Sequence, residues 1–228
     1  MSKTIGILGG MGPAATLDVF QKIIVNTPVQ TEQDHHRILI YNNPKVPPRT
    51  QQSNSLPELI KSAIILEKAG ADFIIMPCNA AHIWLEQIKA AIHIPFYSII
   101  DNTVESILSE EDSAHNHNKI LLLATETTIN NGLYQKAFHH TPCEIITPLK
   151  EEQTIIDNAI QDVKLGNLSS NPYIKDLNRM LNVYKETGVS MIIGGCTEVP
   201  LLFHLFKTDM KMIDPTLLLA KLAVQKAT

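Results

Sequence analysis

Short apolar runs alternate along this chain with longer segments in which apolar residues return every three or four positions. The short runs are typical of strands buried on both faces, and the longer segments are typical of amphipathic helices. We expect strands at residues 5–8, 37–41, 72–76, 94–100, 119–124, 143–147 and 189–193, and helices at residues 14–26, 57–69, 81–91, 132–139, 151–164 and 172–187. This alternation predicts an α/β fold with mainly parallel sheets covered by helices on both faces, a three-layer α/β/α arrangement.

The pattern occurs twice, and in each half one apolar run ends at a cysteine. Leu8, the last apolar residue of the first strand, precedes Cys78 by 70 residues, and Leu123 precedes Cys196 by 73 residues. A similar tetrapeptide then follows in each half, Ile100-Asp101-Asn102-Thr103 and Ile213-Asp214-Pro215-Thr216. An internal duplication is the simplest explanation of these landmarks.

A polar stretch at residues 112–118 separates the two halves. We therefore expect two pseudo-symmetric α/β domains, residues 1–102 with 208–228 and residues 103–207, with the C-terminal helix packing back onto the first. Ligands of open parallel sheets bind beyond the carboxyl ends of the strands, so the active site is expected in the cleft between the domains. The two cysteines would face each other there.

Composition narrows the classes of partner. The net charge is -4 and charged residues make up 18% of the chain, without the basic excess that nucleic acids or membrane surfaces attract. No apolar run approaches the roughly 20 residues of a membrane span, and the first run is too short for a signal peptide. Three cysteines are more typical of free thiols than of a disulfide framework. We expect a cytoplasmic protein that acts on a small molecule.

Two thiols at strand exits suggest acid–base chemistry. A thiol near the start of a helix is expected to have a lowered pKa. One thiolate can remove a proton from carbon on one face while the opposing thiol protonates the other face, which is racemisation without a cofactor. Backbone amides, Asn79 and Thr197 could stabilise the carbanion-like transition state. The alternatives for Cys78 and Cys196 are buried structural thiols, a disulfide or a metal site; His82 is expected to orient the site.

Cations and donors for a substrate can also be identified. Arg49 ends a proline-rich loop and offers a bidentate grip on a carboxylate. Lys164 is a second candidate, although it equally fits a lysine that compensates a helix dipole. The glycine-rich loop around Met11 formally fits a dinucleotide fingerprint, but the second strand ends without the acidic residue of that fingerprint. Its backbone N–H groups are therefore expected to approach a substrate carboxylate. Glu198 suits either a helix cap or a chemical role.

The chain resembles the aspartate/glutamate racemase superfamily, and more closely its aspartate racemase branch, over nearly its whole length. The segments that carry the resemblance are residues 7–13 with 15–16, 43–44 with 49–50, 77–79 with 82, 125 with 128 and 134, 164–166 and 195–202. The resemblance implies a cofactor-independent racemase in which Cys78 and Cys196 are the two bases and Arg49 and Lys164 bind carboxylates. Glu198 stands where glutamate racemases have His, which favours aspartate. Ala80 replaces the Thr of the usual Cys-Asn-Thr, and Pro48 stands where Asp often precedes the Arg.

These lines of reasoning predict an aspartate racemase that is a homodimer and uses neither a cofactor nor a metal. Its substrate would be L- or D-aspartate, with glutamate also possible. The expected substrate-binding residues are Met11, Arg49, Asn79, Ala80, Thr125, Thr128, Lys164, Thr197 and Glu198. The alternatives are a broad-specificity or glutamate-type racemase, and a catalytically silent protein that binds a dicarboxylate.

Overall fold

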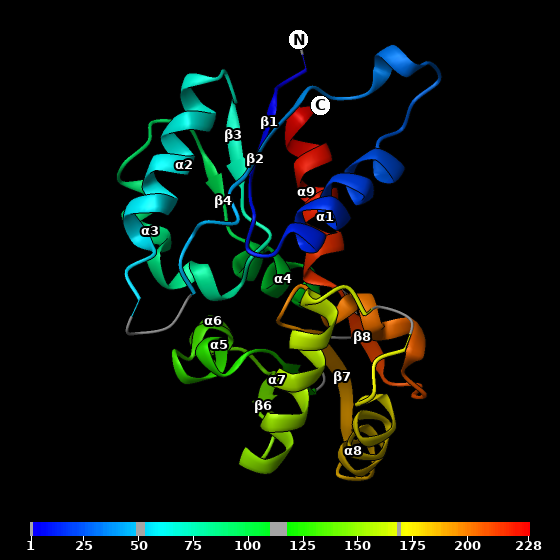
Figure 1. Cartoon of the computed structure of the whole chain (residues 1–228). Helices are drawn as coiled ribbons and strands as arrows, with labels where there is room; N and C mark the ends of the chain where they lie inside the picture. Colours follow the sequence, from blue (N-terminus) through cyan, green and yellow to red (C-terminus); the bar gives the residue numbers. More distant parts are fainter. Residues whose placement is uncertain (1, 49–52, 110–117, 168–169) are drawn as a thin grey trace. The chain divides into compact units, whose positions relative to one another are not determined.

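The computed structural model describes residues 2–48, 53–109, 118–167 and 170–228 (Figure 1). The chain divides into two compact units, Met1–Asn102 with Thr216–Thr228, and Thr103–Pro215. Each unit contains one four-stranded parallel sheet. The predicted α/β fold class with parallel sheets is therefore confirmed.

The two sheets have the same strand order, which is the structural counterpart of the duplicated sequence pattern. The first sheet is ordered β2-β1-β3-β4 and the second β6-β5-β7-β8. The strands of the first are β1 (Ile5–Gly9), β2 (Ile38–Asn42), β3 (Phe73–Ile75) and β4 (Phe96–Tyr97). Those of the second are β5 (Lys119–Leu123), β6 (Glu144–Ile146), β7 (Val189–Gly194) and β8 (Lys211–Ile213).

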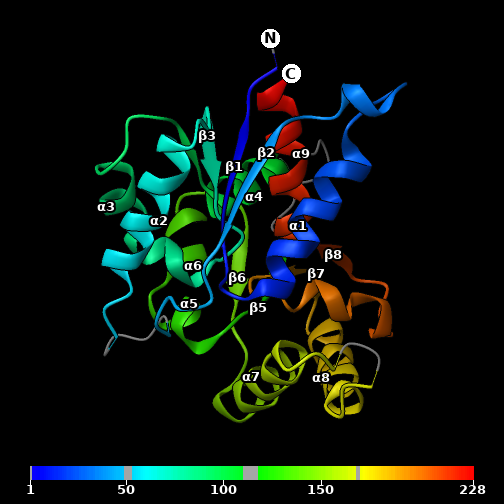
Figure 2. The same cartoon turned by 45° about the horizontal axis from the view of Figure 1, so that its top comes forward.

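Helices cover both faces of the first sheet, as alternating strands and amphipathic helices require. On one face lie α1 (Pro13–Asn26) and α9 (Pro215–Ala227), and on the other α2 (Leu56–Lys68) and α3 (Leu85–Lys89) (Figure 1, Figure 2). Gly12 is extended and Pro13 occupies the first turn of α1, a position that needs no backbone donor. Leu59, Ala63 and Leu66 of α2 pack with Leu8 and Ile74 in one apolar core.

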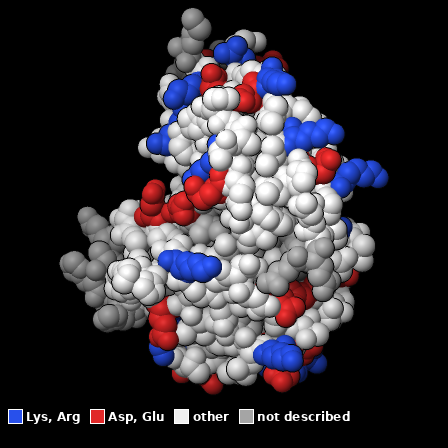
Figure 3. All heavy atoms as spheres, turned by 90° about the vertical axis from the view of Figure 1, so that its left-hand side faces the viewer, with Lys and Arg blue, Asp and Glu red and all other residues white. Residues whose placement is uncertain are grey.

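In the second unit, α7 (Lys150–Lys164) and α8 (Ile174–Glu186) bury their apolar stripes together with residues of β5 and β7. The remaining helices of the described residues are α4 (Ile99–Leu108), α5 (Glu126–Asn130) and α6 (Leu133–Ala137), with 3-10 turns η1 (Glu32–Asp34), η2 (Ala80–Trp84) and η3 (Pro200–Leu205). None of the described helices is long and apolar enough to cross a membrane. In the view of Figure 3, basic side chains are scattered among acidic ones and form no continuous patch of described residues.

The structure corrects the prediction of a strand over residues 94–100. β4 contains only Phe96 and Tyr97, and α4 begins at Ile99. The Ser98 hydroxyl accepts the N–H of Asp101, and the Ser98 carbonyl accepts the N–H of Asn102, so Ser98 starts a helix where an apolar run suggested strand. Likewise the predicted helix over residues 81–91 divides into η2 and α3, and α5 forms at Glu126–Asn130, where no helix was expected.

The predicted equivalence of residues 100–103 with residues 213–216 is also wrong, because β4 ends at Tyr97 and not near residue 100. Tyr97 pairs with Ile75 as Ile213 pairs with Ile193, so Ser98, and not Asp101, corresponds to Asp214. The proposed domain limit at residue 208 is also corrected. Residues 208–215 belong to the second unit because β8 pairs with β7, and the chain returns to the first unit at Thr216.

Candidate active site

The two cysteines leave their sheets at equivalent places. Ile75 of β3 lies opposite Ile7 of the neighbouring strand, and Ile193 of β7 lies opposite Leu122. Cys78 and Cys196 each follow those residues by three positions, beyond the carboxyl end of an inner strand. Their side chains are 5% and 8% exposed, so each thiol is almost wholly removed from solvent while lying at the edge where α/β sheets bind ligands.

Cys78 stands in a tightly bonded turn. Its N–H donates to the Met76 carbonyl at 2.8 Å, and its own carbonyl lies 2.8 Å from Nδ1 of His82. His82 Nε2 accepts the N–H of Ile99 at 3.2 Å. Asn79 is 2% exposed and Ala80 half-buried, so two of the predicted substrate-binding positions lie directly beside this cysteine.

Cys196 has a different partner. Its thiol donates a hydrogen bond to Oε2 of Glu198 at 2.8 Å, and the hydroxyl of Thr197 donates to the same oxygen at 3.3 Å. Glu198 is 1% exposed, and its other oxygen, Oε1, makes no hydrogen bond with any described residue. The turn therefore places a buried carboxylate against the sulfur rather than at the start of a helix.

Burial raises the pKa of the Cys196 thiol well above its usual range, and the Glu198 carboxylate raises it further. The positive charge of Lys164 acts in the opposite direction but is outweighed. The prediction of a lowered pKa is therefore wrong for Cys196. The main reason is burial, which disfavours the thiolate, and the neighbouring Glu198 carboxylate adds to it.

The glycine-rich loop after β1 packs against the start of the proline-rich loop. Gly10 has φ of 101°, and a Cβ there would lie 2.3 Å from the carbonyl carbon of Asn43. The N–H of Gly10 donates to the Thr16 hydroxyl at 2.9 Å, and the N–H of Asn43 donates to the Gly9 carbonyl at 3.2 Å. Only glycine permits this approach and this backbone conformation.

Met11, 3% exposed, belongs to the same apolar cluster as Cys78 and Val46. The structure thus brings the predicted Met11 contact and one of the predicted catalytic thiols together within the first unit. The predicted carboxylate-binding Arg49 lies outside the described residues. Within the described part of the same loop, the Ser55 hydroxyl donates to the Pro47 carbonyl at 3.0 Å.

The exit of β5 in the second unit carries the predicted Thr125 and Thr128. Their hydroxyl oxygens are 3.2 Å apart, and Thr128 is 1% exposed. The backbone carbonyl of Thr125 accepts the N–H groups of Thr128 and Ile129, which begins α5. Lys164 is exposed in the last turn of α7, and its charge lowers the pKa of both Cys196 and Asp157, though in each case against larger causes.

Sequence reasoning missed two residues that hold this exit. Gln153 of α7 donates from Nε2 to the Ala124 carbonyl at 2.8 Å. Asp157, one helical turn further, accepts the N–H of Glu126, while burial raises the pKa of its carboxyl. Polar residues at positions i and i+4 beside the apolar stripe of α7 were the available signal.

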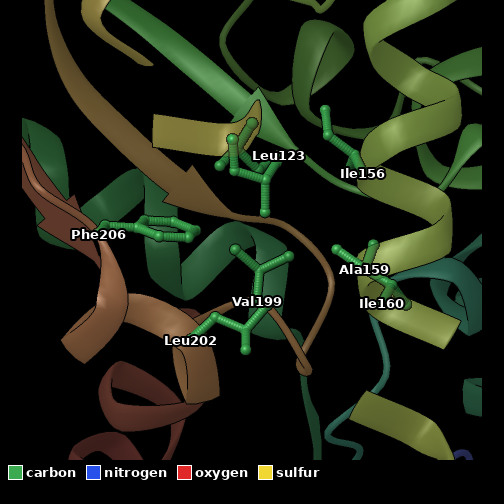
Figure 4. Close-up of a pocket in the computed structure, with 8 residues that line it drawn as sticks. Leu123, Ile156, Ala159, Ile160, Val199, Leu202 and Phe206 are labelled. Carbon is green, nitrogen blue, oxygen red and sulfur yellow. The ribbon is translucent and has the colours of Figure 1, made fainter. Parts of the chain in front are cut away.

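Two further cavities do not belong to the site. An apolar void of about 10 Å³, too small for an amino acid, is lined by side chains that include Leu123, Val199 and Leu202; Figure 4 shows these side chains. A pocket of about 510 Å³ is lined by Phe20, Ile23, Ile24, Thr27, Glu32, His35, His36 and Ile38. Ile38 begins β2, so this pocket lies at the opposite end of the strands from the cysteine exits. The described residues contain no group of three or more His, Cys, Asp or Glu that could hold a metal ion.

Comparison with known proteins finds amino-acid racemases that are similar over nearly the whole chain. The chain is 29% identical to the broad specificity amino-acid racemase RacX of Bacillus subtilis, over 96% of each chain. Its fold is similar to that of the Picrophilus torridus aspartate racemase, with a TM-score of 0.84, 27% identity, and coverage of 99% of this chain and 94% of the other. An aspartate racemase homologue from Pyrococcus horikoshii gives a TM-score of 0.77 and 27% identity over 99% of each chain.

The family model described as Asp/Glu/Hydantoin racemase matches residues 8–223, a span that contains both cysteine exits, the glycine-rich loop and Lys164. This confirms the resemblance drawn from the sequence motifs. The chain therefore belongs to the Asp/Glu/hydantoin racemase family, as a cofactor-independent amino-acid racemase.

Proposed function

We propose that the protein interconverts L- and D-aspartate, with Cys78 and Cys196 as the two acid–base groups. The observation that carries this proposal is the equivalent placement of the two thiols, each three residues beyond a paired residue of an inner strand. Similarity to an aspartate racemase and to a homologue of aspartate racemases supports the choice of substrate.

The proton balance of the reaction follows from two one-proton groups. Cys78, as thiolate, removes the proton from Cα of one enantiomer, and Cys196, as thiol, delivers its own proton to the opposite face. The carbanion-like transition state carries its charge into the neighbouring carboxylate, where backbone and side-chain donors stabilise it. Product release leaves Cys78 protonated and Cys196 as thiolate. That form is the one that accepts the other enantiomer.

The hydrogen bond from Cys196 to Glu198 supports an assignment of the first form. A thiol that donates to a buried carboxylate and whose pKa is raised holds its proton. The same carboxylate, 2.8 Å from the sulfur, can accept or return a proton when the enzyme passes between its two forms. In this proposal Glu198 is therefore a proton partner of Cys196.

Recognition of the two carboxylates of aspartate is assigned to Arg49 and Lys164, whose charges complement them. Met11 and its glycine-rich loop, Asn79, Ala80, Thr125, Thr128 and Thr197 complete the proposed contacts. Ala80 leaves more room beside Cys78 than a threonine would. Together with the similarity to a broad specificity racemase, this favours a second candidate function, racemisation of several amino acids.

We further propose a cytoplasmic homodimer. All three cysteines are free and buried, which is typical of a reducing compartment. Among the described residues of the first unit, the exposed large apolar side chains lie on α1, the segment after it and β2: Leu17, Ile24, Val25, Val29 and Ile40. Such a concentration is typical of an interface between protein chains. Light scattering during gel filtration measures the oligomeric state.

Incubation with L-aspartate and with D-aspartate in deuterated water tests the function, with chiral chromatography and loss of the Cα proton signal as readouts. Both enantiomers should be interconverted with deuterium at Cα, and Cys78→Ala or Cys196→Ala should each abolish racemisation. A panel that includes glutamate and neutral amino acids separates an aspartate enzyme from a broad one. Tight aspartate binding without exchange would instead indicate a catalytically silent binding protein.

A further inference from the structure

The imidazole of His82 is bonded at both of its nitrogens to the backbone of other residues. Nδ1 lies 2.8 Å from the carbonyl oxygen of Cys78, and Nε2 lies 3.2 Å from the amide nitrogen of Ile99. The side chain is 6% exposed and its ring lies steeply inclined to the Phe96 ring, at a centroid separation of 6.4 Å. The ring is therefore held in one orientation within the first unit.

These two partners determine the protonation of the ring. A carbonyl oxygen can only accept a hydrogen bond, so Nδ1 must carry a proton; an amide N–H can only donate, so Nε2 must be unprotonated. Only the neutral Nδ1–H tautomer satisfies both. A cation would place a second N–H against the amide of Ile99.

Burial acts in the same direction, since it lowers the pKa of His82 to about 4. The charged groups that face the ring are Asp101 of α4 and Lys89 of α3; Asp101 raises its pKa and Lys89 lowers it, and both matter less than burial. His82 is thus neutral throughout the range in which a cysteine-dependent enzyme works.

Each bond joins His82 to a backbone group at the end of a strand or at the start of a helix. The Cys78 carbonyl lies beyond the end of β3, where a strand no longer pairs it. Ile99 is the first residue of α4, so its N–H is one of those that an α-helix leaves without an intrahelical acceptor. One side chain therefore joins the exit of the strand that carries Cys78 to the start of the helix that follows β4.

The bond to Cys78 also fixes the plane of the peptide between Cys78 and Asn79. A trans peptide is planar, with its carbonyl and N–H on opposite sides, so anchoring the carbonyl on His82 sets the direction of the Asn79 amide. The backbone on both sides of the thiol is then restrained, by His82 on one side and by the bond from Cys78 N–H to Met76 on the other.

We propose that His82 is a positioning residue of the racemase, which as a neutral imidazole holds the backbone of Cys78 and thereby places its sulfur to exchange a proton with Cα. This role rests on the proposed function, in which Cys78 is one of the two acid–base groups. Displacement of a reacting group by about 1 Å typically costs about 100-fold in rate. His82 would not touch the substrate.

Substitutions can separate the two hydrogen bonds. In His82→Asn the amide nitrogen stands near the position of Nδ1 and keeps the bond to Cys78, but the side chain is too short to reach Ile99. In His82→Gln the amide oxygen stands near Nε2 and keeps the bond to Ile99 but loses that to Cys78. The Asn and Gln variants each lose one buried hydrogen bond, so we expect them to lose similar amounts of folding stability. His82→Phe keeps a ring but makes neither bond.

We expect His82→Asn to keep kcat within about tenfold of the parent, whereas His82→Gln and His82→Phe lose about 100-fold or more in kcat with KM changed by less than about threefold. Melting temperatures of the Asn and Gln variants should be similar. Nitrogen-15 chemical shifts of His82 should show one protonated and one unprotonated ring nitrogen, with the proton on Nδ1, between pH 6 and 9.

Equal losses in the Asn and Gln variants would overturn the positioning role and leave His82 a structural residue. An Nε2–H tautomer or a cation in the nitrogen spectra would overturn its geometric basis. If the parent chain catalyses neither racemisation nor Cα exchange with any amino acid of the panel, the proposed function fails and the positioning role fails with it. If the parent chain is active but the Asn and Gln variants lose activity equally, only the positioning role fails and the proposed function stands.

Discussion

Glu198→Gln should change the behaviour of Cys196 more than any other single substitution that leaves both cysteines in place. The thiol donates to Oε2 at 2.8 Å, and both residues are more than nine-tenths buried. Glutamine keeps the size of the side chain but removes its negative charge. Because that charge raises the pKa of Cys196, its removal should lower the pKa and increase the fraction of thiolate.

The magnitude follows from the electrostatic energy of two close charges. Two unit charges about 4 Å apart interact by ~4 kcal/mol at an effective dielectric constant of about 20. A change of ~1.4 kcal/mol alters the ratio of thiolate to thiol about tenfold. If removal of the Glu198 charge changes the energy of the thiolate by only a third of this ~4 kcal/mol, the fraction of Cys196 thiolate at pH 7 to 8 rises about tenfold. Because the thiolate is the reactive form, alkylation of Cys196 should become about tenfold faster.

Alkylation by iodoacetamide, quantified on the peptide that contains Cys196, measures this reactivity. Glu151→Gln is the matched control, because it removes the same charge from an exposed position of α7. Racemisation should fall about 100-fold. The two directions must lose kcat/KM equally, because the equilibrium constant between enantiomers is one. Alkylation of Cys196 at the parental rate in Glu198→Gln would refute the reasoning.

Three further predictions concern stability. Val199→Ile adds a methylene toward the void of about 10 Å³ and should raise the free energy of unfolding in denaturant by up to ~0.8 kcal/mol. The control Val183→Ile, at a side chain that is 52% exposed, should change that free energy little. A loss of stability in Val199→Ile would show that the void cannot accept a methyl group. Gly10→Ala should lower the free energy of unfolding by more than 2 kcal/mol, because it adds a steric clash to an unfavourable φ. Gly166→Ala, with φ of 100° and nothing within 4 Å of the added Cβ, should lower it by about 1 kcal/mol. Equal losses in the two variants would contradict the packing argument. The pKa of His82 in the folded state lies below its unfolded value of about 6.5. The neutral imidazole should therefore contribute up to about 3 kcal/mol to the free energy of unfolding above pH 6.5, and this contribution should be lost as the pH falls towards 4. His82→Gln should flatten that part of the plot of stability against pH, and an unchanged slope would contradict the lowered pKa.

The sequence allowed the fold class to be predicted because buried parallel strands read as short apolar runs. β1 and β5 lie close to their expected positions for this reason. The same signal failed at residues 94–100, since an apolar run of that length fits a buried strand and the buried start of a helix equally well. Only the hydrogen bonds of Ser98 decide in favour of α4. The short polar helix α5 has no apolar stripe by which it could have been recognised.

Part of the candidate site could be found from sequence because duplication marks it. Cys78 and Cys196 occur in a repeated sequence context, whereas the third cysteine, Cys143, has no counterpart in the other half. The residues that support the site carry no such mark. Gln153 reaches the Ala124 carbonyl across 29 positions of sequence, and His82 meets Ile99 across 17, so their partners depend on the packed fold.

The two strand exits are equivalent in backbone but differ in chemistry. Counting from each cysteine, Ala80 occupies the place of Glu198, and His82 occupies the place of Pro200. In the first unit the polar residue binds the carbonyl of the cysteine, whereas in the second it binds the sulfur. In the proposed mechanism the two thiols are in opposite protonation states, and identical surroundings would not favour such a difference. The divergence at these two positions supplies that difference: the carboxylate of Glu198 keeps the proton on Cys196, while a neutral His82 adds no charge beside Cys78. Introducing a carboxylate with Ala80→Glu should therefore reduce racemisation about as strongly as its removal with Glu198→Gln. Full activity in Ala80→Glu would show that the asymmetry does not matter to turnover.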